Sequence, residues 1–187
     1  GVQTCALPIL DDSVDIWCPI LNEFSGPRMA GLRAQTGQIW WYTCSAPQLP
    51  YPTYLIDDSG SSHRVLSWLQ ALHRVDGVVY WCVNVWTPYS FRTKKYGEKI
   101  TVWEGTDMFG GANGDGYLLY PGKTAESEPI SSIRLEMIRD GNEDVEYVAL
   151  LRALLIRSGV ADPEPRIREL INPVARSLTD WSRDSKT

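Results

Sequence analysis

Histidine and closely spaced cysteines are scarce in this chain. Its 187 residues include two histidines and four cysteines, and no two cysteines form a C-x-x-C pair. Zinc sites built from these residue types need such spaced ligands, so we expect no metal and no cofactor. The cysteines also form no disulfide framework. Cys18, Cys44 and Cys82 each lie in or at the end of an apolar run, and we expect buried free thiols there.

Clusters of basic residues and long apolar runs are also missing. Lys and Arg number 18 against 23 Asp and Glu, for a net charge of −5, whereas a nucleic-acid-binding surface needs clustered positive charge. No apolar run approaches the roughly 18 residues of a membrane helix. We therefore expect neither nucleic acid nor a membrane as a partner. The 43% hydrophobic and 22% charged residues are typical of a folded globular protein.

A glycine-rich phosphate loop is absent as well. The segment GGANGDG, residues 110–116, precedes an apolar run and does not open a helix. A dinucleotide-binding turn follows a strand and begins a helix. A small doubly wound nucleotide-binding protein is therefore disfavoured.

Tryptophan and tyrosine are abundant instead. The chain has eight Trp and nine Tyr against three Phe. Both side chains combine a flat apolar face with a polar tip, which suits sugars, bases and partner surfaces, although both also fill protein cores.

The opening segment, GVQTCALPIL, does not resemble the rest of the chain. It has no basic residue at its start, an apolar run of only about four residues and no small-x-small cleavage site, so it lacks the features of a secretion signal. Residues 2–9 are what GTG CAG ACG TGT GCT CTT CCG ATC encodes, and this string resembles a common sequencing-library adapter. We expect residues 1–9 to be a non-native sequencing artefact, with Cys5 outside any redox argument. The alternative is a short buried strand, ALPIL.

Apolar runs alternate with helical patterns between residues 13 and 86. The runs at 13–21, 38–44 and 77–86 predict strands, and because they are continuous we expect both of their faces to be covered. Residues 25–37 and 61–75 have helical spacing and helical start or stop signals. Helical crossovers of this length join parallel strands, so the order predicts a parallel sheet.

The pattern changes after Trp86. Residues 87–116 are expected to be a long loop region, followed by a short strand at 117–122. An amphipathic stretch over 131–158 predicts a long helix. Asp162-Pro163 and Asn172-Pro173 are typical starts of two further short helices.

These elements predict an α/β fold, the C-terminal part of a (β/α)8 TIM-like barrel with about three βα units plus C-terminal helices. A complete barrel takes roughly 250 residues. The residues that follow the suspected artefact at 1–9 are too few for one. We assign residues 10–160 to the C-terminal part of a barrel and residues 161–187 to a helical tail. The suspected artefact lies directly before the first strand, where such a barrel would have been cut.

Several segments carry a family resemblance. They are DIWCPILNEF (15–24), WWYTCSAPQLPYPTYLID (40–57), RVLSWLQALHRVDGVVYWCVNVW (64–86), GDGYLLYPG (114–122) and PISSIRLEMIRDGNEDVEYVALL (129–151). Together they resemble the C-terminal barrel segment of glycoside hydrolase family 123, also catalogued as domain of unknown function 4091. The resemblance implies exo-cleavage of β-linked N-acetylgalactosamine, with carbohydrate containing N-acetylhexosamine as the partner. It also implies a retaining mechanism in which the substrate's acetamido oxygen attacks the anomeric carbon, an Asp orients the acetamide and the adjacent Glu is the acid/base.

The chain departs from this family pattern at the catalytic pair. In the family the Asp-Glu pair ends an earlier strand, upstream of every segment quoted above. The acidic neighbours Asp11-Asp12, Asp57-Asp58 and Glu143-Asp144 are better explained as turns or helix surface. We therefore assign no catalytic residue and do not expect catalysis by this chain alone. The alternative is a non-catalytic carbohydrate-binding or scaffold domain that uses the same aromatic residues.

Candidate substrate-binding residues follow from the barrel, because its active site forms at the C-terminal ends of the strands. Trp86 offers an indole face for a sugar ring and an N–H donor, with core packing as the alternative. Asn84 offers a donor and an acceptor in an otherwise apolar strand, and a buried amide needs partners. Tyr42 is similar, and Trp17 also lies at a predicted strand end. Trp40, Trp41 and Trp81 are expected in the core.

Two further candidates lie in loops. Tyr54 could line the rim of the pocket, although the neighbouring prolines also explain a rigid surface loop. Asp115, within GDG, could reach the site, but turn chemistry predicts the same residues. For Arg64 we expect a carboxylate partner such as Asp57.

The helix predicted at 131–158 carries charged residues with a structural interpretation. We expect Arg134, Arg139 and Asp140 to fasten this helix to the barrel, and Arg139 to pair with Glu143 four residues later. The compartment is not indicated by this sequence. Secretion or a periplasmic location is expected for the full-length protein, since it suits the substrate class.

Overall fold

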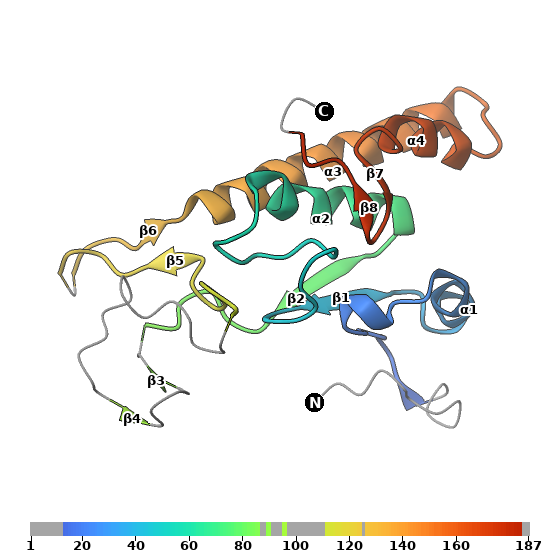
Figure 1. Ribbon diagram of the computed structural model, residues 1–187. Coiled ribbons are helices and arrows are strands. Elements are labelled where there is room, and N and C mark those ends of the chain that lie inside the picture. Colours follow the sequence, from blue (N-terminus) through green and yellow to red (C-terminus); the bar gives the residue numbers. More distant parts are fainter. Residues whose placement is uncertain (1–12, 87–88, 91–94, 97–110, 125, 185–187) are drawn as a thin grey trace.

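The computed structural model describes residues 13–86, 89–90, 95–96, 111–124 and 126–184 (Figure 1). The suspected artefact at 1–9 and the pair Asp11-Asp12 lie outside these residues, as does most of the loop region predicted at 87–116. No helix in the described part combines the length and the apolar character needed to cross a bilayer.

The N-terminal half has the predicted order of extended and helical elements. A short 3-10 helix, η2 (Leu21–Glu23), precedes α1 (Gly26–Thr36), β1 (Trp40–Thr43), α2 (Gly60–His73) and β2 (Gly77–Tyr80). Helix α1 has Pro27 in its first turn, where a missing N–H costs nothing, and ends at Gly37, whose φ of 79° favours glycine.

The parallel arrangement is confirmed. Strands β1 and β2 pair in parallel, with Trp40 opposite Gly77 and Thr43 opposite Tyr80. The segment before η2 lies beside β1 and forms two parallel bridges, Trp17 with Ile39 and Ile20 with Tyr42. The continuous strand predicted at 13–21 is wrong, because Pro19 in its middle has no N–H to donate to a ladder.

Coverage of the strands differs from the prediction. Strand β1 alternates between half-buried and buried residues, with Trp41 and Thr43 fully enclosed. All residues of β2 are only half-buried. The apolar runs therefore do not have two covered faces in this structure. The covered side of β1 faces α2, since Trp41 shares a core with Leu66 and Leu69.

Helix α3 (Ile133–Arg157) lies along α2 (Figure 1). The close approach requires Gly141, because a Cβ there would lie 2.7 Å from the Arg64 carbonyl oxygen and 2.8 Å from Ser67 Oγ. Asp144 then joins the helices by accepting from Arg64 Nε at 2.7 Å, Arg64 Nη2 at 2.8 Å and Trp68 Nε1 at 2.7 Å. The partner of Arg64 is thus Asp144, and the predicted partner, Asp57, is wrong.

Within the described residues up to 184, a short helix and a hairpin follow α3. Helix α4 (Glu164–Ile171) occurs as predicted, but β7 (Ala175–Ser177) and β8 (Asp180–Trp181) replace the second short helix. Ser177 Oγ accepts the backbone N–H groups of residues 179 and 180, which favours a turn over a helix. Trp181 then reaches the core and donates its N–H to the Pro50 carbonyl at 3.0 Å.

The remaining strands are short and antiparallel. Strand β3 (Tyr89–Ser90) pairs with β4 (Lys95–Tyr96), and β5 (Leu119–Tyr120) pairs with β6 (Ile130–Ser131). The strand predicted at 117–122 is therefore shorter. Residues 83–85, which follow β2, run antiparallel to residues 116–119 through backbone hydrogen bonds and an Asn84–Tyr117 bridge. This contact brings the end of β2 against the GDG turn.

Candidate functional site

The candidate site lies where β1 and β2 end and meet the segment 114–120, and we call it the strand-end site. Asp115 is at its centre, with 1% of its surface exposed. Its Oδ1 accepts the Tyr80 hydroxyl at 2.8 Å and its Oδ2 accepts Trp81 Nε1–H at 2.9 Å. The Tyr80 oxygen in turn accepts the Gly116 N–H at 2.8 Å. Asp115 therefore organises the site from within and does not present its carboxylate to a ligand.

Groups within the protein stabilise the ionised carboxylate of Asp115. Burial raises the pKa of Asp115, while the bonds from Tyr80 and Trp81, the backbone of Ser45 and the nearby Arg134 oppose that rise. Burial also raises the pKa of the Tyr80 hydroxyl, so it remains a donor at any physiological pH.

Arg134, in the first turn of α3, fastens the segment around Asp115 to this helix. It is 3% exposed and donates to the carbonyl oxygens of Tyr54 at 2.6 Å and Gly114 at 2.8 Å, and to that of Tyr117. The prediction that Arg134 fastens the long helix to the rest of the fold is confirmed.

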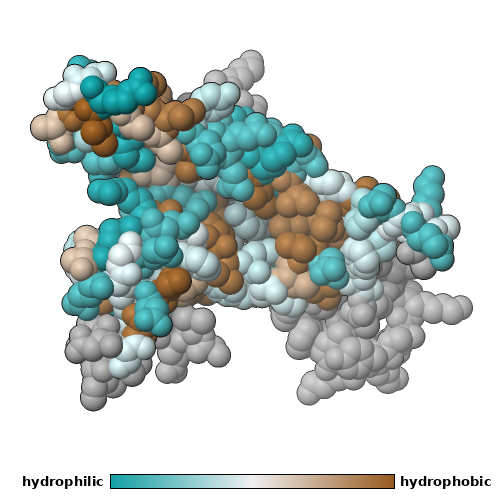
Figure 2. Space-filling model, turned by 180° about the vertical axis from the view of Figure 1, so that it is seen from behind, coloured by the Kyte–Doolittle hydropathy of each residue, from teal (hydrophilic) through white to brown (hydrophobic). Residues whose placement is uncertain are grey.

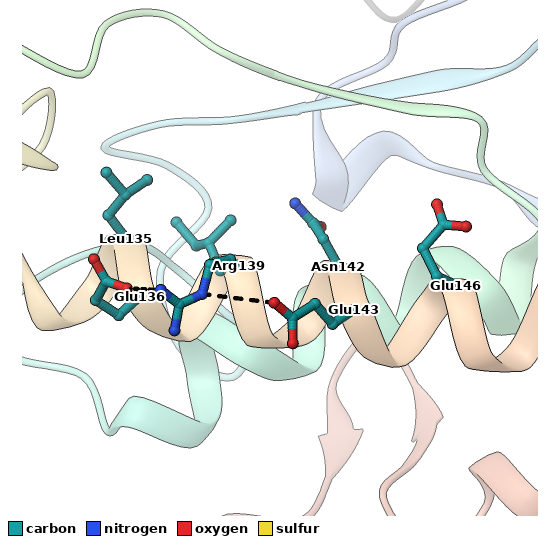
Figure 3. Close-up of a pocket in the computed structure, with 7 residues that line it drawn as sticks. Leu135, Glu136, Arg139, Asn142, Glu143 and Glu146 are labelled. Carbon is teal, nitrogen blue, oxygen red and sulfur yellow. Dashed lines mark ion pairs between the residues drawn. The ribbon is translucent and has the colours of Figure 1, made fainter.

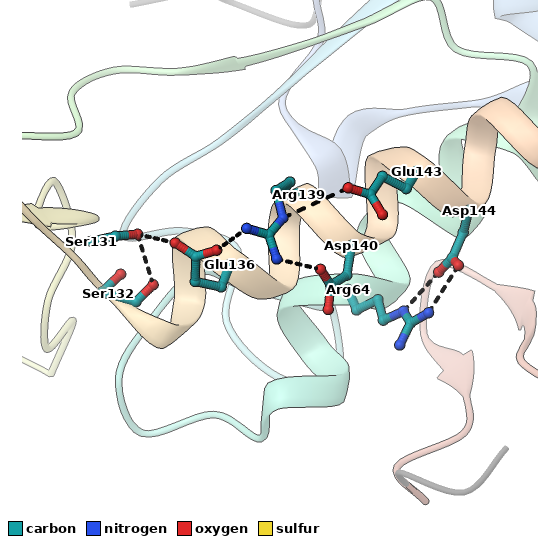
Figure 4. Close-up of polar contacts among 8 residues, drawn as sticks. All are labelled: Arg64, Ser131, Ser132, Glu136, Arg139, Asp140, Glu143 and Asp144. Atoms are coloured by element: carbon teal, nitrogen blue, oxygen red, sulfur yellow. Dashed lines mark hydrogen bonds and ion pairs between the residues drawn. The ribbon is translucent and has the colours of Figure 1, made fainter.

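Arg139 and Asp140 do not have that role. Arg139 is largely exposed and forms ion pairs within its own helix, with Glu136, Asp140 and Glu143 (Figure 4). The predicted pair with Glu143 is confirmed, at 3.7 Å. In Figure 4 the Arg64–Asp144 pair points from α3 toward α2, whereas the Arg139 contacts lie along the surface of α3.

Trp81 lies at the surface, where the sequence had placed it in the core. Its side chain is 38% exposed even though its N–H is bound to buried Asp115. A Cβ at Gly116 would lie 2.7 Å from Trp81 Cζ2, so the glycine allows the indole to rest against the turn. The GDG motif was the sequence signal for this close approach, because glycines around an aspartate indicate a close approach to the backbone as well as a turn.

Trp86 and Asn84 are both exposed. The Trp86 indole is 36% exposed, but its N–H donates to the Leu119 carbonyl at 2.9 Å. Trp86 therefore offers a ligand its ring face, whereas the N–H donor expected from the sequence is already bound within the protein. Asn84 was expected to be a buried amide; it is exposed instead, and its Oδ1 is 3.5 Å from Cys82 Sγ.

The other sequence candidates lie deeper. Tyr42 is half-buried, and burial together with a hydrogen bond to Cys44 raises the pKa of its hydroxyl. Tyr54 is 4% exposed and packs edge-to-face on Tyr80, with ring centroids 5.3 Å apart, so it is a core residue and not a rim residue. Trp17 is 8% exposed and packs in the small core under α1, with Met29 and Ile39.

Metal-binding groups do not gather in the described part. Within residues 13–86, 89–90, 95–96, 111–124 and 126–184, no three His, Cys, Asp or Glu side chains could hold a metal ion together. Cys18, Cys44 and Cys82 are free, as expected, but half-buried where full burial was predicted.

A separate groove of about 500 Å³ lies along the surface of α3 (Figure 3). In Figure 3 the labelled side chains rise from one stretch of this helix, and Arg139 spans Glu136 and Glu143 by ion pairs. These charges are paired with one another, and the groove lies apart from the strand-end site. We therefore keep the strand-end site as the candidate functional site.

The comparisons with known proteins decide the family. The family model for glycoside hydrolase 123, catalytic domain, matches residues 8–151. The chain belongs to glycoside hydrolase family 123. Its α/β elements over residues 8–151 are accordingly matched to the catalytic domain of that family.

A solved structure supports the same fold. A family 123 glycoside hydrolase from Clostridium perfringens, reported for the details of glycolipid glycan hydrolysis, superposes with a TM-score of 0.63 at 20% identity. The match covers 90% of this chain and 27% of that chain. This family 123 chain thus spans about a quarter of that protein's length. No curated protein matches the sequence.

Proposed function

We propose that this chain supplies part of the sugar-binding surface of an exo-β-N-acetylgalactosaminidase. The family assignment over residues 8–151 carries this proposal. It is supported by the position of Trp86 and Asn84, which are exposed just beyond β2, where a barrel enzyme forms its active site. An indole face suits the apolar side of a pyranose ring, and the amide suits a hydroxyl or the acetamide.

The chemistry of the reaction belongs to residues outside this chain. We propose the substrate-assisted, retaining mechanism. The acetamido oxygen attacks the anomeric carbon as the glycosidic C–O bond breaks and the Glu protonates the leaving-group oxygen. Water then attacks the anomeric carbon of the bicyclic intermediate, gives a proton back to the Glu carboxylate and releases the acetamido oxygen. The Asp-Glu pair is supplied by an earlier strand of the same barrel. Residues 10–160 form the end of that barrel, residues 161–187 follow it, and the full-length enzyme is secreted or periplasmic.

The test begins with the genomic sequence upstream of residue 10. The protein from the full reading frame should contain at least four more βα units and an Asp-Glu pair. It should release 4-nitrophenol from the 2-acetamido-2-deoxy-β-galactoside, and NMR should show the β-anomer of the sugar as first product. The β-galactoside without the acetamide is the matched control and should not react. A start codon directly before Asp11, or equal turnover of both glycosides, would overturn the proposal.

A carbohydrate-binding domain without activity is the second candidate. The exposed tryptophans favour it equally, because they need no acid/base pair to hold a sugar. It predicts a full-length protein that lacks the paired acids yet binds N-acetylated sugars in calorimetry. Hydrolysis of the acetamido-galactoside would exclude it.

A further inference from the structure

One buried carboxylate holds two consecutive aromatic residues. Asp115 accepts the Tyr80 hydroxyl on one oxygen and the Trp81 indole N–H on the other, at 2.8 and 2.9 Å. Consecutive residues of a strand point to opposite faces. Both can reach one carboxylate because β2 ends at Tyr80 and the chain bends at Trp81. The end of β2 is thus shaped around Asp115.

The turn that carries this carboxylate is itself held in place by other residues. Asp115 is flanked there by Gly114 and Gly116, with φ angles of 76° and 80° that favour glycine. Arg134 fixes this turn by binding the carbonyl oxygens on either side of it, at Gly114 and Tyr117. An oxygen held in this way can set the orientation of the indole that donates to it.

Trp81 is held at both ends of its ring system and still reaches solvent. Its N–H is bound by Asp115, and its six-membered ring rests on Gly116, where a Cβ would lie 2.7 Å from Cζ2. The side chain remains 38% exposed. A rigid aromatic surface loses little conformational entropy when a ligand covers it, which favours binding.

We propose that Trp81 is a sugar-contacting residue of the strand-end site, beside Trp86, and that Asp115 is the positioning residue that sets its indole. This inference rests on the proposed function, since the ligand is the N-acetylhexosamine ring. It replaces the expectation that Asp115 itself contacts the sugar.

The experiment uses the 15N-labelled protein from the full reading frame. Each Trp gives one indole N–H signal, and Trp81→Phe identifies that of Trp81. Titration with methyl 2-acetamido-2-deoxy-β-galactoside should shift this signal saturably. Trp81→Ala should weaken sugar binding about tenfold, as loss of a buried aromatic contact does. Trp81→Phe keeps a ring but cannot donate to Asp115, and should lie between Trp81→Ala and wild type.

Asp115→Asn tests the positioning role. It should move the Trp81 signal in the absence of sugar and weaken binding about as much as Trp81→Phe. The matched control is Trp68→Phe, which removes the same kind of bond, from indole N–H to Asp144 at 2.7 Å, between α2 and α3. That variant should leave sugar affinity unchanged even if its melting temperature falls.

The outcomes separate this inference from the function. If the acetamido-galactoside is hydrolysed but Trp81→Ala binds it normally, the inference is overturned and the function stands. If hydrolysis fails while the sugar still shifts the Trp81 signal, the function is overturned and the inference stands. Absence of any shift overturns the inference. Should Asp115→Asn fail to fold, Trp81→Phe with wild-type affinity would overturn the positioning role.

Discussion

At the scale of single residues, His63 shows how burial creates a pH dependence. It is 3% exposed, and its Nε2–H donates to the Leu55 carbonyl at 2.9 Å. Burial lowers the pKa of this imidazole, with nearby Arg134 acting in the same direction and the backbone bond and Asp58 opposing. The folded protein therefore holds His63 neutral at a pH where the unfolded chain binds a proton.

The sign of the resulting effect is fixed by linkage. The unfolded imidazole has a pKa of about 6.5, so the stability contributed by neutral His63 is complete above that pH and is lost as the pH falls toward the lowered folded value. We expect the melting temperature of the full-reading-frame protein to fall between pH 7.5 and 5.5. His63→Gln should reduce this slope. An unchanged slope in that variant would show that His63 does not titrate on unfolding.

The site residues illustrate the limits of sequence patterns at this scale. Trp17 and Trp81 both follow apolar residues near strand ends, and the sequence favoured the first as a sugar contact. In the structure Trp17 packs under α1, while Trp81 is exposed. The indole N–H of Trp81 is held by Asp115, which is 34 residues away in the sequence. A local pattern carries no information about such a partner.

At the scale of elements, the contact between α2 and α3 depends on a missing side chain. Gly141 is in the interior of α3, where alanine is intrinsically better by about 1 kcal/mol. A Cβ there would nevertheless lie 2.7 Å from the Arg64 carbonyl oxygen, which belongs to a rigid helix. The helices would have to separate, and the Asp144 bonds to Arg64 and Trp68 would lengthen with them.

We therefore expect Gly141→Ala to lower the free energy of unfolding by about 2 kcal/mol, the usual cost of overpacking. Gly31→Ala is the matched control. Gly31 lies inside α1 and has no atom within 4 Å of its Cβ position. It should raise stability by about 0.5–1 kcal/mol through helix propensity. Urea unfolding of the full-reading-frame protein measures both. Stabilisation by both substitutions would contradict the close packing.

Element boundaries were predictable where local signals exist. Helices α1, α2 and α3 lie within two residues of their predicted bounds, because periodicity, Pro27 and the glycines at 37 and 159 act locally. The segment after Asn172 forms a hairpin, and its local signal was misleading. Burial of Ala175 and Trp181 against α2 outweighs the helix-start preference of Asn-Pro.

At the scale of the whole molecule, the sheet is open. All residues of β2 are half-buried, and among the described strands β2 pairs only with β1. The face seen from behind includes a broad hydrophobic area bordered by polar residues (Figure 2). Contiguous apolar surface and unpaired strand edges favour association.

We expect residues 10–187 expressed alone to be insoluble or molten. A soluble fraction should bind the dye ANS and lack a near-UV circular dichroism signal while keeping its helical far-UV signal, the features of a molten globule. The full-reading-frame protein is the control and should bind little dye. A sharp two-state melt of residues 10–187, without dye binding, would contradict this expectation.

The sequence by itself determined α1 to α4, the parallel order of β1 and β2, and the family, because periodicity, turn residues and short motifs are properties of neighbouring residues. The tertiary structure alone decided which aromatic side chains are exposed, that Asp115 is enclosed, and that Asp144 is the partner of Arg64. These outcomes depend on contacts between distant segments: 34 residues separate Trp81 from Asp115, 80 separate Arg64 from Asp144, and 131 separate Pro50 from Trp181. Burial and hydrogen bonding at such separations follow from how elements pack, and no local pattern encodes them.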